Sequence, residues 1–179
     1  MYMDILKKIV NHYDYYENIV VNLKWTELHT KYYDWYKKYP VGMFVTTVDF
    51  PEDYVKNNFE QAYVQTALTH MAYAEEFKED FRNVPSSELL EYMTQNVPFY
   101  AEYMTYEELR MIPITGEQLT EIIKLHTGRY SIPESEVNAV IPYIRGAETI
   151  EVGGHYYGDH TFVSIKDHSM MLVECGIWD

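Results

Sequence analysis

The chain has 179 residues and carries 28 acidic against 14 basic side chains, a formal net charge of −14. Apolar residues make up 47% and aromatic residues 16%, including 19 tyrosines, which is too apolar for a disordered acidic tail. The negative field repels phosphate groups, so direct binding to nucleic acid or to anionic membranes is not expected.

The cysteine content indicates whether the protein works in an oxidising or a reducing compartment. Cys175 is the single cysteine, so a disulfide framework within the chain is excluded and a reducing environment fits. The first residues lack the features of a signal peptide, and no run of about 18 apolar residues occurs. We therefore expect a cytoplasmic protein.

The first fifty residues are neutral, with six acids against six bases. Apolar spacing predicts a helix over 4–16, then either a strand or a continued helix over 18–25. Helical spacing returns over 27–39 and ends at Pro40 and Gly42. The β-branched and aromatic stretch 43–50 predicts a strand.

The middle of the chain is helical and acidic. Pro51 begins a predicted helix over 51–82, and shorter helices follow over 86–111. A capping box, Thr115 to Gln118, begins a helix that Gly128 closes with a left-handed cap. A further box begins at Ser131, and the helix that it starts ends at Gly146.

The last 32 residues alternate or run apolar and predict three antiparallel strands, over 149–152, 160–166 and 170–178. The turn at 166–169 fits a hairpin loop. The fold class is α+β, a central helical region with a small C-terminal antiparallel β-sheet. We expect one domain, 1–179, with a neutral segment 1–50, an acidic helical region 51–146 and a β-meander 147–179.

Carboxylates and tyrosines interleave over residues 73–117 and predict an acidic docking surface. Its candidate binding residues are Tyr73, Glu75, Glu76, Glu79, Asp80, Glu88, Glu91, Tyr92, Tyr100, Glu102, Tyr103, Tyr106, Glu107 and Glu108. In size and composition the chain resembles acidic inhibitors of phages and mobile elements, anti-restriction and anti-CRISPR proteins among them. The resemblance implies a non-catalytic partner for a basic protein, such as a nuclease. A solvated acidic helical face is the alternative.

Residues 155–168 suggest a different function, a small hydrolase that uses His160 with Asp159 or Asp167. Residues 155–178, in which a strand that begins at His160 is followed by a turn and a second strand, resemble the histidine half of papain-like or transglutaminase-like cysteine hydrolases. Cys175, however, lies downstream of the histidine on a predicted strand, where a core role is expected. No catalytic residue is therefore assigned, and a structural homo-oligomer is a third alternative.

Several other functions find no support in the sequence. Strand alternation places His155 and Asp159 on one face and His160 on the other, so no metal site is expected. Phosphate-loop and dinucleotide motifs are absent, so no cofactor is expected. The two helices and hairpin of the C-terminal half follow the order of a winged helix, but acids such as Glu134 and Glu136 stand where bases should. An ordinary helical hairpin is the preferred interpretation.

Overall fold

The computed structural model describes residues 2–39, 41–74, 81–96, 111–129, 131–152 and 160–175. Its centre is a six-stranded antiparallel sheet with the strand order β1-β2-β6-β5-β4-β3. The strands are β1 (His29–Asp34), β2 (Met43–Asp49), β3 (Met111–Ile114), β4 (Glu148–Val152), β5 (His160–Ile165) and β6 (Ser169–Cys175).

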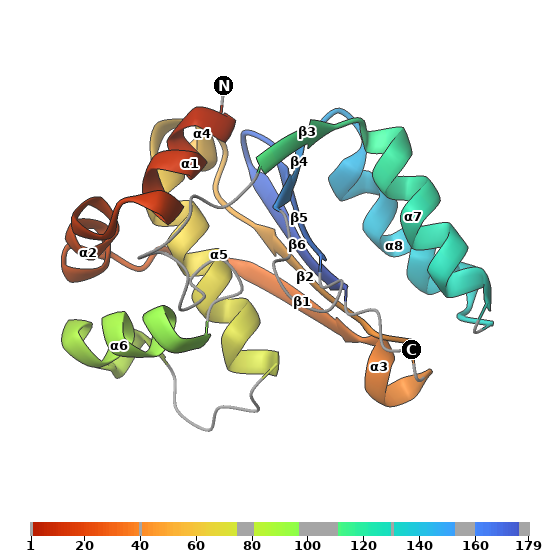
Figure 1. Ribbon diagram of the computed structural model, residues 1–179, viewed down its shortest axis with the longest axis horizontal. Coiled ribbons are helices and arrows are strands. Elements are labelled where there is room, and N and C mark those ends of the chain that lie inside the picture. Colours follow the sequence, from red (N-terminus) through yellow and green to blue (C-terminus); the bar gives the residue numbers. More distant parts are fainter. Residues whose placement is uncertain are drawn as a thin grey trace.

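Helices cover both faces of this sheet (Figure 1). One face carries α1 (Tyr2–Asn11), α2 (Tyr13–Val21), α4 (Tyr54–Asn57), α5 (Phe59–Ala74) and α6 (Ser86–Asn96). The other face carries α7 (Gly116–Arg129) and α8 (Glu134–Ile144). The single-turn α3 (Trp35–Lys38) follows β1, and the 3₁₀ turn η1 (Phe81–Asn83) precedes α6. Within the described ranges, no helix is long and apolar enough to cross a membrane.

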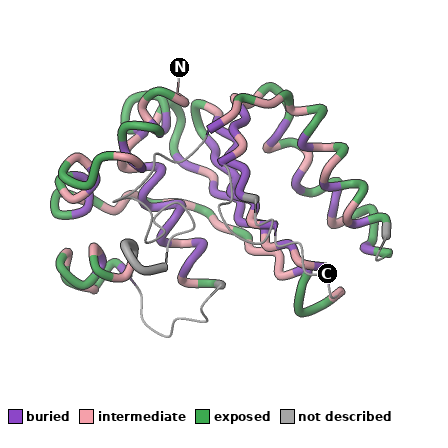
Figure 2. The backbone as a smooth tube through the Cα atoms, viewed as in Figure 1, coloured by how far each residue is buried: buried purple, intermediate pink, exposed green. Residues whose placement is uncertain are grey.

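Strands β2, β5 and β6 contribute to two cores because their side chains alternate between the faces of the sheet. On β2, Val48 belongs to the core beneath α1, α2 and α5, whereas Val45 belongs to the core beneath α7 and α8. Figure 2 shows the same pattern, with buried positions along the central strands and the inner sides of the helices. The sheet is therefore the shared layer between the two groups of helices.

The expectation of a small C-terminal sheet is wrong, although a mixed α+β fold is correct. The predicted strand at 43–50 is confirmed as β2, and it pairs with β6 from Met43↔Cys175 to Asp49↔Ser169. The three C-terminal strands are also confirmed, but they join strands from earlier in the chain. Sequence periodicity shows that a segment forms a strand, but it does not show which distant strand that segment pairs with.

Two further strands were not predicted. Residues 29–34 were expected to be helical, but they form β1 along β2, and only 35–38 make a helical turn. Residues 111–114 form β3 beside β4, whereas the sequence predicts short helices as far as 111 and no element over 112–114. In the ambiguous stretch 18–25, the helical alternative holds as far as Val21.

Helix boundaries agree with the sequence in part. The Thr115 box is confirmed, because Thr115 N–H donates to Gln118 Oε1 at 2.8 Å and Gln118 N–H donates to Thr115 Oγ1 at 3.1 Å. The predicted helix 51–82 forms α4 and α5 with an interruption at Asn58, and its last two residues, 81 and 82, belong to the 3₁₀ turn η1. The Ser131 box is wrong, since α8 begins at Glu134 without a side-chain cap.

Glycines at the predicted helix ends behave differently from each other. Gly128 lies inside α7 and is not among the described residues with positive φ, so its predicted left-handed cap is wrong. Gly146 does follow α8 with a φ of 74°. The sequence also predicts a capping box from Thr105 to Glu108, and this segment lies outside the described residues.

Candidate functional site

Helices α2 and α6 pack against each other at the end of the molecule farthest from α7 and α8 (Figure 1). The buried residues of α2 are Tyr16, Ile19 and Val20, and α6 buries Leu89. The two helices carry Asp14, Glu17, Glu88 and Glu91 and no lysine or arginine. We call these four carboxylates the acidic face. Three of them are exposed, and Glu17 is half-buried.

The carboxylates of the acidic face make no hydrogen bond or ion pair with another side chain of the described residues. Lys8 of α1 is near, but its ammonium lies 4.5 Å from the centre of the Tyr15 ring. Exposed Tyr13, at the start of α2, adds an aromatic contact surface with 45% of its area accessible. The lysines of the first fifty residues therefore leave the acidic face open.

The structure describes only part of the predicted docking surface. Glu88 and Glu91 are exposed on α6, and Tyr73 is 45% exposed near the end of α5. Tyr92 is half-buried, with its ring centre 5.0 Å from that of Phe81. The other predicted members lie outside the described residues: Glu75, Glu76, Glu79, Asp80, Tyr100, Glu102, Tyr103, Tyr106, Glu107 and Glu108. Sequence reasoning missed Asp14 and Glu17, because they precede the acidic middle and join it only through packing.

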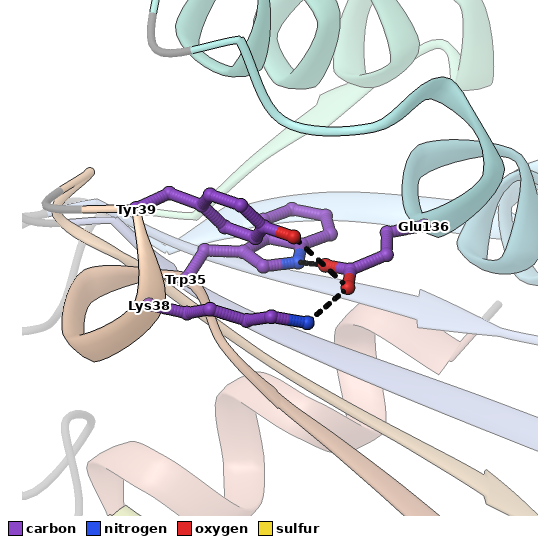
Figure 3. Close-up of polar contacts among 4 residues, drawn as sticks. All are labelled: Trp35, Lys38, Tyr39 and Glu136. Atoms are coloured by element: carbon purple, nitrogen blue, oxygen red, sulfur yellow. Dashed lines mark hydrogen bonds and ion pairs between the residues drawn. The ribbon is translucent and has the colours of Figure 1, made fainter.

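Glu136 shows what a neutralised carboxylate looks like in the same protein (Figure 3). Its carboxylate accepts from Trp35 Nε1 at 2.9 Å, from Lys38 Nζ at 2.7 Å and from the Tyr39 hydroxyl at 3.3 Å. Burial works to raise the pKa of Glu136, but the hydrogen bonds from Lys38 and Trp35 outweigh it and lower that pKa. This carboxylate fastens α8 to α3 and is not free to bind a partner.

A buried polar network lies on the α5 side of the sheet. His70 Nδ1 is 2.7 Å from Thr46 Oγ1 of β2, and His70 Nε2 is 2.9 Å from Glu174 Oε2 of β6. The Tyr32 ring meets the imidazole edge-on, with centres 5.9 Å apart, and Tyr73 stacks on Tyr32. The network joins α5 to β1, β2 and β6.

The network has the order of a catalytic triad, a hydroxyl, an imidazole and a carboxylate. Thr46 and His70 are nevertheless 0% exposed, so no substrate reaches the hydroxyl in this arrangement. Thr46, His70 and Glu174 are far apart in the sequence, and no local pattern predicts their contact. The available signal was Glu174, the only charged residue in the apolar strand 169–175, together with a histidine on the apolar side of a helix.

The structure does not bring His160 and Asp167 together. His160 begins β5 opposite Cys175, whereas Asp167 lies in the turn beyond the other end of that strand. The backbone runs about 17 Å between His160 and Ile165, at roughly 3.3 Å per residue. Asp159 lies outside the described residues.

Asp167 is engaged in a contact with the start of α1. Its Oδ1 accepts from the Tyr2 hydroxyl at 3.0 Å. Burial and this hydrogen bond raise the pKa of Tyr2 to about 12. No group of three or more metal-ligating side chains occurs among the described residues.

Comparison with known proteins gives no relative: no family model, curated protein or solved structure matches the chain.

Proposed function

We propose that the protein is a non-catalytic acidic inhibitor. It docks on the basic nucleic-acid channel of a nuclease or another nucleic-acid-handling enzyme, in the manner of anti-restriction and anti-CRISPR proteins. The observation that supports this is the acidic face, in which two packed helices carry four carboxylates and no cation. Unpaired carboxylates on helices imitate the phosphates that such a channel binds.

The contrast with Glu136 strengthens the proposal. Where this protein uses a carboxylate for structure, it supplies an indole, an ammonium and a phenol to bind it. The acidic face has no such partners among the described side chains, so its charge is available to a basic surface. A field of this kind accelerates association with an oppositely charged partner.

A charge-neutralising variant tests the proposal. Asp14→Asn, Glu17→Gln, Glu88→Gln and Glu91→Gln would be combined in one chain. The matched control neutralises the exposed carboxylates Glu52, Asp53, Glu121 and Glu134, which lie outside α2, α6 and the segment 73–117. Both variants change the net charge equally. Each is immobilised, and the basic proteins that it retains from a host extract are identified and purified.

Affinity for the retained enzyme is then measured at rising salt and in competition with duplex DNA. We expect the acidic-face variant to bind at least about tenfold more weakly and the control to bind like the parent. Binding should weaken with salt, and DNA should displace the protein. Equal losses in both variants, or affinity that is unchanged by salt, would contradict the proposal.

A further inference from the structure

Helices α7 and α8 pack against each other as an antiparallel hairpin on one face of the sheet (Figure 1). The start of α7 lies against the end of α8, because a Cβ added at Gly116 would lie 3.1 Å from the carbonyl oxygen of Ile144. Both residues line a hollow of about 450 Å³ that extends along α7. This volume falls within the roughly 300–1,000 Å³ of small-molecule sites, so the hollow has room for a small ligand.

One side of α7 supplies polar side chains to the hollow. Glu117, Thr120, Glu121 and Lys124 have the spacing i, i+3, i+4 and i+7, which places them along one side of the helix. Glu117 and Glu121 are neighbours on that side, and like charges four residues apart destabilise a helix. A cationic group between these two carboxylates would relieve their repulsion. Lys124 lies about 10 Å farther along the helix axis than Glu117, at roughly 1.5 Å per residue.

The end of α8 supplies a cation and an apolar surface. Arg145 directly follows Ile144, so it lies at the same end of the hollow as Gly116 and Glu117. Ile141 and Ile144 line the hollow next to it. A guanidinium group matches a carboxylate through two parallel hydrogen bonds. This end of the hollow therefore offers partners for a carboxylate, for an ammonium and for an apolar body.

The charged side chains of the hollow are exposed, and none forms an ion pair or a side-chain hydrogen bond with a described residue: Glu117, Glu121, Lys124 and Arg145. Elsewhere in the protein, Lys38 and Glu136 pair at 2.7 Å. Two acids and two bases around the hollow thus remain available, and their charges cancel. A ligand that carries both signs fits such a lining, and the net charge of −14 does not repel a neutral zwitterion.

We propose that this hollow binds a small zwitterion of the α-amino-acid class. Arg145 binds its carboxylate, and its ammonium lies between Glu117 and Glu121. The side chain of the ligand packs on Ile141 and Ile144. Because the two charged groups of an α-amino acid are attached to one carbon atom, both are bound at the same end of the hollow. Lys124, at the other end, is not needed.

The probes are the common α-amino acids, titrated at millimolar concentration into isotopically labelled protein and followed by two-dimensional NMR. The amide signals of Gly116 and Gly146, which both line the hollow, report binding. The tightest binder is then compared with its N-acetyl derivative, which lacks the ammonium, and with its methyl ester, which lacks the carboxylate. Each derivative should bind at least about tenfold more weakly than the amino acid. The ester is the stricter probe, because it is a cation that an acidic protein attracts in general.

Variants of the protein assign each charge to its partner. Arg145→Gln should weaken binding of the amino acid by about tenfold and barely change binding of the ester. Glu117→Gln combined with Glu121→Gln should remove the advantage of the amino acid over its N-acetyl derivative. Lys124→Gln is the matched control, since it removes an exposed cation from the far end of the same hollow, and it should bind like the parent. All four side chains are exposed, so the variants keep the fold, which the melting temperature verifies.

Any of three results would overturn the proposal. The first is that no common amino acid moves the signals of Gly116 and Gly146. The second is that the ester binds as tightly as the amino acid. The third is that Lys124→Gln weakens binding as much as Arg145→Gln, which would assign the hollow to a longer molecule. Neutralising the acidic face should leave amino-acid binding intact, and Glu121→Gln should leave binding of the basic enzyme intact, so this proposal and the proposed function fail separately.

Discussion

Thr46→Val removes one hydroxyl from the buried network and keeps the shape of the side chain. The hydroxyl lies 2.7 Å from His70 Nδ1, and both residues are 0% exposed. Water therefore cannot replace it, and the imidazole nitrogen loses its partner. A buried polar atom left without a hydrogen bond costs about 1–3 kcal/mol. We expect the free energy of unfolding to fall by that amount.

Thr66→Val is the matched control. Thr66 is also 0% exposed, but its hydroxyl donates to the Ala62 carbonyl, an acceptor that the helix itself uses. Removing it leaves no orphaned atom, so the cost should stay within roughly 0.5 kcal/mol. Combining Thr46→Val with His70→Leu replaces both hydrogen-bonding partners by apolar groups. The double variant should lose less than the sum of the single variants.

Urea unfolding followed by circular dichroism measures these differences. In a chain of this length, about 1 kcal/mol corresponds to a change of about 2–4 °C in the melting temperature, so thermal unfolding gives an independent reading. Equal costs for the two threonine variants would refute the role assigned to the network. Strict additivity in the double variant would do the same.

Four other substitutions have defined outcomes in the same unfolding assays. Gly116→Ala should destabilise the protein by about 1–3 kcal/mol, because the added Cβ would lie 3.1 Å from the Ile144 carbonyl oxygen. Gly128→Ala has open space around the added Cβ, so it should stabilise α7 by up to about 1 kcal/mol. Thr30→Val should raise the free energy of unfolding by about 1 kcal/mol, since it removes a buried hydroxyl that has no hydrogen-bond partner. A loss of stability would show instead that this hydroxyl is hydrogen-bonded. Glu148→Gln should destabilise at neutral pH only. Burial raises the pKa of Glu148, but the backbone N–H groups at the start of α1 outweigh it and lower that pKa, so its contribution is present above pH ~4.3 and disappears as the pH falls through the lowered value. A parent–variant difference that persists in acid would contradict this.

Segments whose pattern is local were predicted well from the sequence. The strand at 43–50, the C-terminal strands and the Thr115 box all depend on residues close in the chain, and the structure contains each of them. The turn at 166–169 is also present, with Lys166 N–H donating to the Ser169 carbonyl at 2.9 Å. Alternation and capping chemistry are visible without knowledge of the distant chain.

Residues 29–34 show why the rest was not predictable. Tyr32, Trp35, Tyr36 and Tyr39 have helical spacing, but pairing with β2 overrides it, and Tyr32 packs on His70 and Tyr73. Strand preference depends on cross-strand and same-face neighbours, which the local sequence does not contain. The acidic face illustrates the same limit. Its α6 members were predicted from composition, whereas its α2 members are brought there by packing.

The order of the strands also affects how the chain acquires its structure during synthesis. β6, the last described strand, lies between β2 and β5 and contributes to both cores. Its pairing with β2 joins residues as distant as Met43 and Cys175. A nascent chain that stops short of residue 169 has β2 and β5 but no strand to join them, so both halves of the sheet keep an unpaired edge. Assembly must therefore wait until residues 169–175 have left the ribosome, and contacts of such long range favour slow folding.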